Sequence, residues 1–221
     1  MDKKFWLILT VVVAVIIGVF VLAGGKKTSG DSKFTGDPRQ VQTDDWTEGP
    51  TGAKVTLIEY GDFQCPGCGA LFPALEQIKA EMGDKFLFVF RHFPLTSIHP
   101  NAMAAHRAAE AAGQQGKFFA MHDLLYARQV QWSNASSAAS IFETYASELA
   151  LNAEQFKTDV ASQEVFDKIA RYQDSGNQLG LTSTPTLLLN GQKIDNPASV
   201  DELQQVLNDA ISAAEGEAAA P

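Results

Sequence analysis

Two residues of the sequence stand out for the chemistry they can do: Cys65 and Cys68, its only cysteines, in the run CPGC. Two thiols at this spacing can form a structural bridge, supply half of a metal site or exchange disulfides with other molecules. As a bridge the pair would close a very short loop, and the stabilisation from loop closure is smallest for short loops. A purely structural role therefore explains the pair poorly.

A zinc site is a second interpretation of the pair, and the sequence does not favour it. Structural zinc normally takes four ligands, yet there is no second cysteine pair. We expect His122 to be a packed helix residue, since it shares an apolar face with Phe118 and Leu125, and we expect His99 to lie in a loop. The sequence has four histidines, and none has the spacing from the CPGC run that is typical of zinc ligands: His92, His99, His106 and His122. We therefore expect no metal.

Disulfide exchange is the remaining chemistry for the pair. Pro66 suits the first turn of a helix, so Cys65 would lie at the helix N-terminus. Unpaired backbone N–H groups and the helix dipole favour a thiolate there, and the thiolate is the reactive form. Cys68, one turn further along, would point inward and resolve a mixed disulfide.

The elements around the pair read as a strand, a helix and a second strand. Residues 55–60 are a short apolar run rich in β-branched and aromatic residues, which is typical of a buried strand. Residues 85–93 read as the second strand. A helix lies between them, with apolar residues at three- and four-residue spacing at Leu71, Leu75, Ile78 and Met82. Such a unit favours a parallel strand pair.

The remainder of the chain predicts a helical block followed by a hairpin and a last helix. Helical periodicity runs from about residue 99 to 180. Residues 186–189 then read as a strand, and Asn190-Gly191 favours a tight turn into a second strand at 192–194. A capping-box pattern, Ser199 with Glu202, opens the final helix.

The ends of the chain carry different signals. Residues 5–25 contain no charge, and roughly 20 apolar residues suffice to cross a bilayer. A cleaved secretory signal is the alternative, but its apolar region runs only ~7 to 15 residues, so we favour an anchor within residues 1–27. Residues 28–50 are polar and predict a flexible linker. Residues 213–221 offer nothing to pack and predict a disordered tail.

The charge of the chain excludes one class of partner. Lys and Arg number 17 against 26 Asp and Glu, for a formal net charge of -9, and the first 27 residues hold four of the lysines. An acidic body does not follow the phosphates of a nucleic acid, so no nucleic-acid partner is expected.

Four runs of the sequence together resemble the DsbA-like thioredoxin-fold thiol-disulfide oxidoreductases, particularly the membrane-tethered bacterial type. The runs are VTLIEYGDFQCPGC, FRHFPL, AAEAAGQQGKFFAMHDLLY and LTSTPTLLLNGQ. This resemblance implies an α/β thioredoxin-like fold, a central mixed β-sheet flanked by helices, formed by residues 51–95 and 176–212. An inserted all-helical subdomain would occupy residues 96–175.

The resemblance also implies roles for particular residues. In this family the first cysteine attacks, the second resolves and a cis-proline loop faces them, roles that carry over to Cys65, Cys68 and Pro185. A cis-proline loop would leave neighbouring backbone groups free to pair with an extended substrate. Thr184 is either a turn residue alone or a residue whose hydroxyl group reaches a cysteine sulfur. The expected substrate-binding residues are Pro66, Gly67, Thr184 and Pro185.

Glu59, six residues before Cys65, matches the buried acid of the family. Alternation along the strand places it on the same face as Val55 and Leu57, which favours burial, a raised pKa and a role in proton transfer. The alternative is a surface strand residue. No cofactor is expected beyond the redox-active disulfide of Cys65 and Cys68.

The resemblance implies an enzyme that introduces disulfide bonds into unfolded or reduced secreted proteins. It would be a single-pass membrane protein with its catalytic domain on the extracytoplasmic side, reoxidised by a quinone-linked membrane oxidase, and we expect a monomer. Gly67 stands where the most oxidising relatives have histidine, so an oxidase of intermediate strength is expected. A disulfide reductase or isomerase would use the same residues, and a tethered chaperone would need only the groove around Pro185. Both alternatives stay open.

Overall fold

The computed structural model describes residues 33–219 of the chain. The predicted anchor within residues 1–27 lies outside this part. Between residues 33 and 219, none of the helices combines the length and the apolar character that a membrane span requires.

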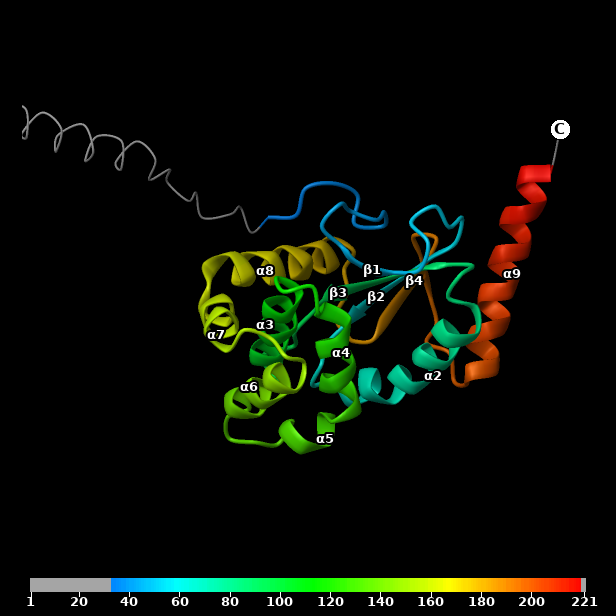
Figure 1. Cartoon of the computed structure of the whole chain (residues 1–221). Coiled ribbons are helices and arrows are strands. Elements are labelled where there is room, and N and C mark those ends of the chain that lie inside the picture. The colour runs from blue at the N-terminus through cyan, green and yellow to red at the C-terminus, as the bar shows by residue number, and fades with distance from the viewer. Residues whose placement is uncertain (1–32, 220–221) are drawn as a thin grey trace, which may run out of the picture. The chain divides into compact units, whose positions relative to one another are not determined.

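A five-stranded mixed sheet lies at the centre of the described chain, in the order β1-β3-β2-β4-β5 (Figure 1). The predicted parallel pair is confirmed, because β2 (Thr56–Gly61) and β3 (Leu87–His92) run parallel. The predicted hairpin is confirmed as well: β4 (Thr186–Leu189) turns into β5 (Gln192–Ile194), and Asn190 and Gly191 both have positive φ. β4 is antiparallel to β2, so β2 lies between β3 and β4.

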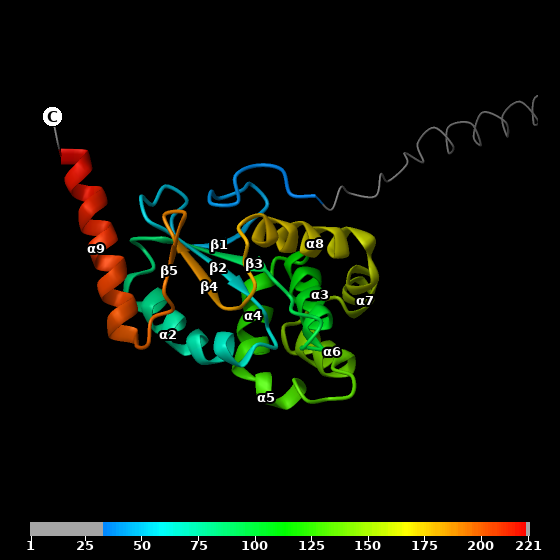
Figure 2. The same ribbon diagram turned by 180° about the vertical axis from the view of Figure 1, so that it is seen from behind.

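Helix α2 (Pro66–Met82) connects the two parallel strands. Its apolar face is buried as the spacing predicts, at Leu71, Leu75, Ile78 and Met82. α9 (Val200–Ala219) packs beside α2, with Leu203 and Leu207 buried in the core (Figure 2).

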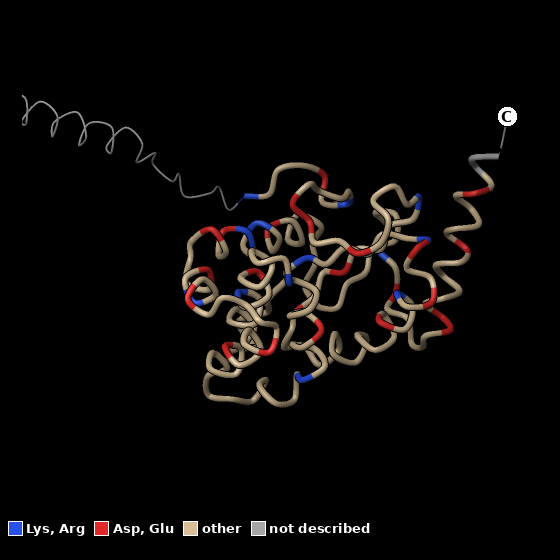
Figure 3. The backbone as a smooth tube through the Cα atoms, viewed as in Figure 1, with Lys and Arg blue, Asp and Glu red and all other residues tan. Residues whose placement is uncertain are grey.

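Six helices between β3 and β4 form the predicted helical block. In Figures 1 and 2 the block lies away from α9, and its helix α4 contacts α2. α8 contacts β3 directly. The six helices are α3 (Ala102–Gly113), α4 (Phe118–Ala127), α5 (Gln129–Trp132), α6 (Ala139–Glu148), α7 (Ala153–Ala161) and α8 (Gln163–Gln178). Figure 3 shows basic residues interspersed with acidic ones over this block, whereas α9 carries acidic residues.

The predicted linker is wrong over residues 33–50. β1 (Trp46–Glu48) pairs antiparallel with β3, and Phe34 is buried. Asp45 forms an ion pair with Arg91 of β3, and both side chains are fully buried. Arg91 also donates to the carbonyl oxygens of two linker residues, Pro38 at 2.7 Å and Gln40 at 2.6 Å. A polar segment is thus held by one buried cation, which composition alone does not reveal.

Two further predicted boundaries need correction. α9 continues to Ala219, so the predicted tail over 213–221 is helical as far as that residue. Alanine and glutamate are strong helix formers, and Ala214 packs on the core. α8 continues to Gln178, which puts the predicted boundary between residues 175 and 176 inside one helix.

Candidate redox-active site

Cys65 is the N-cap residue of α2, directly before Pro66 at the start of the helix. Its backbone N–H donates to Asp62 O at 3.0 Å, and its thiol donates to Thr184 O at 3.3 Å. Cys65 is 8% exposed, whereas Cys68 is 1% exposed. Both are free thiols. The predicted arrangement, an outer sulfur at the helix end and an inner sulfur one turn along, is therefore present.

The two thiols differ in acidity. The pKa of Cys65 falls to about 5, mainly through the hydrogen bond with the Cys68 side chain, with help from Thr184 and from backbone N–H groups, while burial opposes the shift. Burial raises the pKa of Cys68 well above its ordinary value, and the hydrogen bond with Cys65 and the nearby charge of Glu59 add to the increase. At neutral pH, Cys65 is the nucleophilic thiolate and Cys68 stays protonated.

Glu59 on β2 is buried near the pair, with 1% of its surface exposed. Burial raises the pKa of Glu59 to about 8, the charge of Cys65 acts in the same direction, and Lys79 opposes it. Neither carboxyl oxygen has a hydrogen-bond partner among residues 33–219. The predicted burial and raised pKa are confirmed, so the carboxyl group carries a proton at neutral pH.

The bond between Thr184 and Pro185 is cis, as the resemblance implies. A Cβ atom at Gly67 would lie 3.2 Å from Pro185 Cδ and 3.7 Å from Cys65 Sγ, so glycine lets the loop approach the CPGC turn closely. Pro185 O accepts from Asn196 Nδ2 at 2.9 Å, and Thr184 O accepts from Cys65. Each carbonyl group thus has one internal partner and can still accept a second hydrogen bond, so pairing with an extended substrate stays a prediction.

Thr184 lies against Cys65 with both its carbonyl oxygen and its side chain. In the thiol form, its carbonyl oxygen and not its hydroxyl is bonded to Cys65. The Thr184 hydroxyl is without a hydrogen-bond partner in the described part of the chain. The Thr184 side chain nevertheless lowers the pKa of Cys65, because a hydroxyl at this place can turn to donate to the thiolate.

Asp62, three residues before Cys65, organises the turn that leads into α2, and the sequence analysis did not identify it. Its carboxylate is fully buried and accepts from the backbone N–H groups of Gln64 and Leu95, each at 2.8 Å. His99, in a loop as predicted, lies with Nδ1 2.7 Å from the same carboxylate. The Asp-x-x-Cys spacing is an Asx-turn pattern and could have signalled this role.

Two glutamines link the CPGC turn to the helical block, and these too were missed. Gln129 of α5 donates to Phe63 O at 2.8 Å and to Cys65 O at 2.9 Å. Gln64 donates to Ser133 O at 2.7 Å. No sequence signal points to these contacts, because the partners are more than 60 residues apart. The inserted helices therefore help to position the first cysteine.

Two grooves flank the cysteine pair. One, of about 300 Å³, lies between α2 and the cis-proline loop and is lined by Gly67, Leu71, Pro185 and Pro197 among others. The other, of about 530 Å³, borders Pro66 and α5. It carries two exposed aliphatic side chains, Ile98 (68% exposed) and Val130 (84% exposed). Of the predicted substrate-binding residues, Pro66, Gly67 and Pro185 line these grooves and Thr184 does not.

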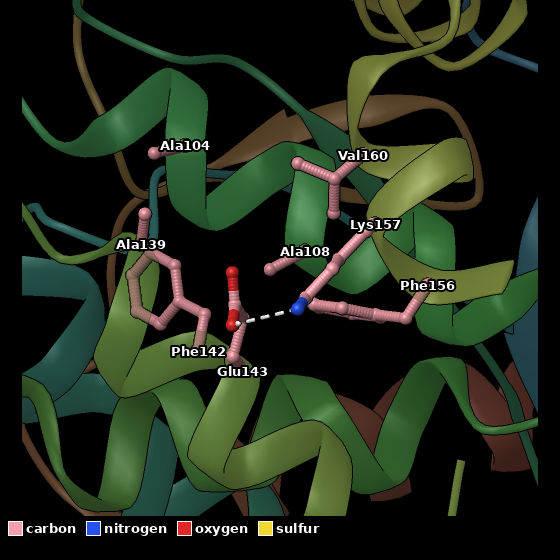
Figure 4. Close-up of a pocket in the computed structure, with 8 residues that line it drawn as sticks. All are labelled: Ala104, Ala108, Ala139, Phe142, Glu143, Phe156, Lys157 and Val160. Carbon is pink, nitrogen blue, oxygen red and sulfur yellow. Dashed lines mark ion pairs between the residues drawn. The ribbon is translucent and has the colours of Figure 1, made fainter. Parts of the chain in front are cut away.

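A separate cavity of about 180 Å³ lies within the helical block (Figure 4). Apolar side chains from α3, α6 and α7 line most of it, and an ion pair between Lys157 and Glu143 lies at its side with 3.5 Å between the charged atoms. None of its lining residues belongs to the redox pair or the cis-proline loop. In residues 33–219 there is no group of three or more His, Cys, Asp or Glu arranged to hold a metal ion.

The three remaining histidines are buried. His122 is a packed helix residue as predicted, with its ring against those of Phe63 and Phe90. His92 and His106 lie side by side with 2.5 Å between their Nδ1 atoms, and His92 Nε2 is 2.7 Å from Glu110 Oε1. Burial lowers the pKa of all three rings.

A family model described as thioredoxin matches residues 42–209, well over half of the chain. The chain therefore belongs to the thioredoxin family. Solved structures define the fold further. The alpha-DsbA1 structure from Wolbachia pipientis superposes with a TM-score of 0.71 at 19% identity, over 82% of this chain and 99% of that one. The fold is that of the DsbA-like thioredoxin-fold proteins.

Two more solved structures have the same fold. A thioredoxin-like oxidoreductase from Silicibacter pomeroyi DSS-3 gives a TM-score of 0.66 at 24% identity, covering 80% of this chain and 98% of that one. BdbD from Bacillus subtilis gives 0.65 at 21% identity, covering 75% and 92%.

Curated relatives with a different name also match. A protein named Na(+)/H(+) antiporter NhaA 1 from Salinispora arenicola is 36% identical over 168 residues, which is 76% of this chain but 25% of the relative. Its namesake from Mycolicibacterium gilvum is 36% identical over 167 residues, 74% of this chain and 26% of the relative. The chain thus spans about a quarter of the length of these relatives.

Proposed function

We propose that this protein is an extracytoplasmic thiol-disulfide oxidoreductase that introduces disulfide bonds into translocated proteins through Cys65 and Cys68. One observation carries the proposal: an outer sulfur with a pKa of about 5 at a helix N-terminus, beside an inner sulfur with a pKa raised well above 9.0. This difference favours a redox pair in which one sulfur exchanges with substrates and the other closes the cycle.

The chemistry begins with the oxidised Cys65–Cys68 disulfide. A substrate thiolate attacks Cys65 Sγ, the bond to Cys68 breaks, and Cys68 leaves as a thiolate that takes a proton supplied by Glu59. A second substrate thiolate then attacks the substrate sulfur of the mixed disulfide, and Cys65 leaves as a stable thiolate. The substrate has lost two electrons and gained a disulfide, and the protein has gained those two electrons.

The acidity of Cys65 favours this direction of transfer. Stabilising the thiolate stabilises the reduced protein, which makes the disulfide a better oxidant. Three residues bring the stabilisation about at this helix end: Cys68, Thr184 and, through its backbone N–H group, Gly67. Gly67 supplies no side-chain cation, so an oxidase of intermediate strength is proposed.

The sequence supports a place outside the cytoplasm for this activity. We propose that residues 5–25 anchor the chain in the cell membrane and that the part from residue 33 faces the extracytoplasmic side. Its substrates would be unfolded or reduced secreted proteins bound along the grooves beside Pro66 and Gly67. A quinone-linked membrane oxidase would restore the disulfide.

Covalent trapping tests the proposal. Replacing Cys68 by alanine removes the resolving sulfur, so the Cys68→Ala protein should accumulate substrate proteins linked through Cys65. The adducts should disappear on reduction and be absent from a protein that carries both Cys65→Ser and Cys68→Ala. An absence of adducts from the Cys68→Ala protein in its native compartment would contradict the proposal.

The redox state in the cell separates an oxidase from a reductase or isomerase. Alkylation of the free thiols in intact cells should find the Cys65–Cys68 pair mostly oxidised. A pair found mostly reduced would instead indicate a reductase or isomerase that an electron donor serves.

A further inference from the structure

Tyr126 of α4 places its hydroxyl group in the core without a hydrogen-bond partner among the described residues. The residue is 4% exposed, and its ring packs against Phe63 and Phe72. A phenylalanine would make the same ring contacts. Buried polar groups in native proteins are nearly always paired, so an unpaired hydroxyl calls for a functional explanation.

The hydroxyl group borders the same gap as the carboxyl group of Glu59. Gly61 has no side chain, and a Cβ atom placed on it would lie 2.9 Å from Tyr126 Oη and 3.0 Å from Glu59 Oε1. The ring of Phe90 is nearer still, with Cε2 2.5 Å from that Cβ position, so both oxygens lie beside this ring on the same side of β2. Both Glu59 oxygens lack partners among residues 33–219, like the hydroxyl group itself.

The inner sulfur lies at the same place. Cys68 Sγ accepts from the backbone N–H of Asp62 at 3.5 Å, and Asp62 follows Gly61 directly in the chain. Burial raises the pKa of Tyr126 well above its ordinary value; the nearby charges of Cys68, Glu59 and Asp62 raise it further, as does the hydrogen-bonding approach of the Cys68 side chain. Three groups that can hold a proton thus converge on the Gly61–Asp62 peptide, and one of them is on the inserted helical block.

We propose that Tyr126 relays a proton between Glu59 and Cys68. The inference rests on the proposed redox role of the pair and extends it to a residue outside the thioredoxin-like core. When Cys68 leaves as a thiolate, the Tyr126 hydroxyl gives its proton to the sulfur and takes one from the Glu59 carboxyl group. After the transfer Tyr126 is again a neutral phenol, Glu59 is a carboxylate and Cys68 is a thiol. Reoxidation runs the same transfer backwards.

A relay is needed because Cys68 is buried and cannot exchange its proton directly with solvent. At 1% exposure the sulfur has almost no contact with solvent, so its proton has to pass through neighbouring groups. A hydroxyl group can donate one proton while it accepts another, so Tyr126 can pass a proton between Glu59 and Cys68, which form no hydrogen bond with each other. Tyr126 does not need to ionise, in keeping with its high pKa.

The test is the rate at which Cys68 resolves a mixed disulfide between Cys65 and glutathione. The reduced full chain is mixed with oxidised glutathione, quenched with acid and analysed by mass spectrometry between pH 5 and 9. Tyr126→Phe should slow resolution about 100-fold at pH 7, which is the lower end of the range for general acid–base catalysis. Formation of the mixed disulfide at Cys65 should not change.

Tyr172→Phe is the matched control. Tyr172 is also buried, and its hydroxyl group likewise lacks a partner in the described part of the chain, but no hydrogen bond or charge effect joins it to either cysteine. Its loss should leave resolution unchanged. The protein with both Tyr126→Phe and Glu59→Gln should resolve the mixed disulfide no more slowly than Glu59→Gln alone, because the two substitutions interrupt the same proton path.

Resolution by Tyr126→Phe within twofold of the unmodified protein over the whole pH range would overturn the relay. If Glu59→Gln alone were slow in that case, Glu59 would act without Tyr126 and the proposed function would stand. A second measurement uses the unmodified protein in mixtures of H2O and D2O. If two protons move together, a plot of the resolution rate against the deuterium fraction should be curved. A linear dependence would also count against the relay, whereas a failure of Cys68 to resolve at all would defeat the proposed function.

Discussion

Replacing Glu59 by glutamine should stabilise the reduced protein, and the gain should depend on pH. The pKa of the carboxyl group is about 8 in the folded protein against 4.5 as an ordinary value. Between these two values the folded state keeps a proton that the unfolded state releases. Unfolding is therefore favoured more and more as the pH rises from 4.5 to 8, and the residue costs stability over that window.

The magnitude follows from the two pKa values. Each pH unit in the window is worth about 1.4 kcal/mol, so the cost is on the order of 3 kcal/mol at pH 7 and approaches its limit, about 5 kcal/mol, above pH 8. Glutamine keeps the size of the side chain and has no proton to lose. Glu59→Gln should therefore match the unmodified protein near pH 4.5 and exceed it by about 3 kcal/mol at pH 7.

Urea unfolding with a reductant present, at several pH values from 4.5 to 8.5, measures this difference. Cys65 titrates in both proteins, so its contribution largely cancels. Glu215→Gln, on an exposed position of α9, is the control and should show no pH-dependent gain. A stability difference between Glu59→Gln and the unmodified protein that stays constant over this pH range would refute the reasoning.

Three further predictions concern stability. Asp45→Ala should lower the free energy of unfolding, measured with urea, by about 3 to 5 kcal/mol, because it leaves Arg91 charged and buried without its partner. A loss below about 1 kcal/mol would mean that residues 33–50 are not part of the folded unit. Ala104→Leu should fill part of the helical cavity and raise stability by about 1 kcal/mol, whereas a loss of stability would show that the cavity cannot take the side chain. The buried rings of His92, His106 and His122 are neutral when the protein is folded and become protonated when it unfolds in acid. Below pH 6.5 the Glu59→Gln protein should therefore lose up to about 1.4 kcal/mol of stability per pH unit for each ring. Equal stability at pH 5 and 6.5 would contradict this.

Local patterns were sufficient to predict most of the elements. The apolar spacing after Pro66 predicts the buried face of α2, and Asn190-Gly191 predicts the β4–β5 turn. The pattern failed where a single buried group holds a polar segment. Arg91 lies in a strand that reads as apolar, and its bonds to Asp45 and to backbone carbonyls fold a segment with the composition of a linker.

The candidate site divides in the same way. Cys65, Cys68 and Glu59 lie in one short run, so spacing and strand alternation suffice to predict their relative placement. Gln129 and Tyr126 come from the inserted helices, and only the packing of those helices against the sheet brings them to the pair. Side chains recruited across the fold in this way leave no pattern in a single sequence.

The acidity of Cys65 has a direct electrochemical consequence. A pKa of about 5, against an ordinary 9.0, favours the reduced form by about 3 kcal/mol at pH 7. That free energy corresponds to roughly 60 mV in a two-electron couple. No side-chain cation at Gly67 adds to it.

Equilibration with reduced and oxidised glutathione at pH 7 gives the reduction potential of the Cys65–Cys68 pair. The proposed oxidase should lie between about -270 mV, the value for thioredoxin, and about -120 mV, the value for the strongly oxidising DsbA. A potential at or below about -270 mV would contradict it, because such a value is that of thioredoxin and would show that the acidity of Cys65 does not make the disulfide more oxidising.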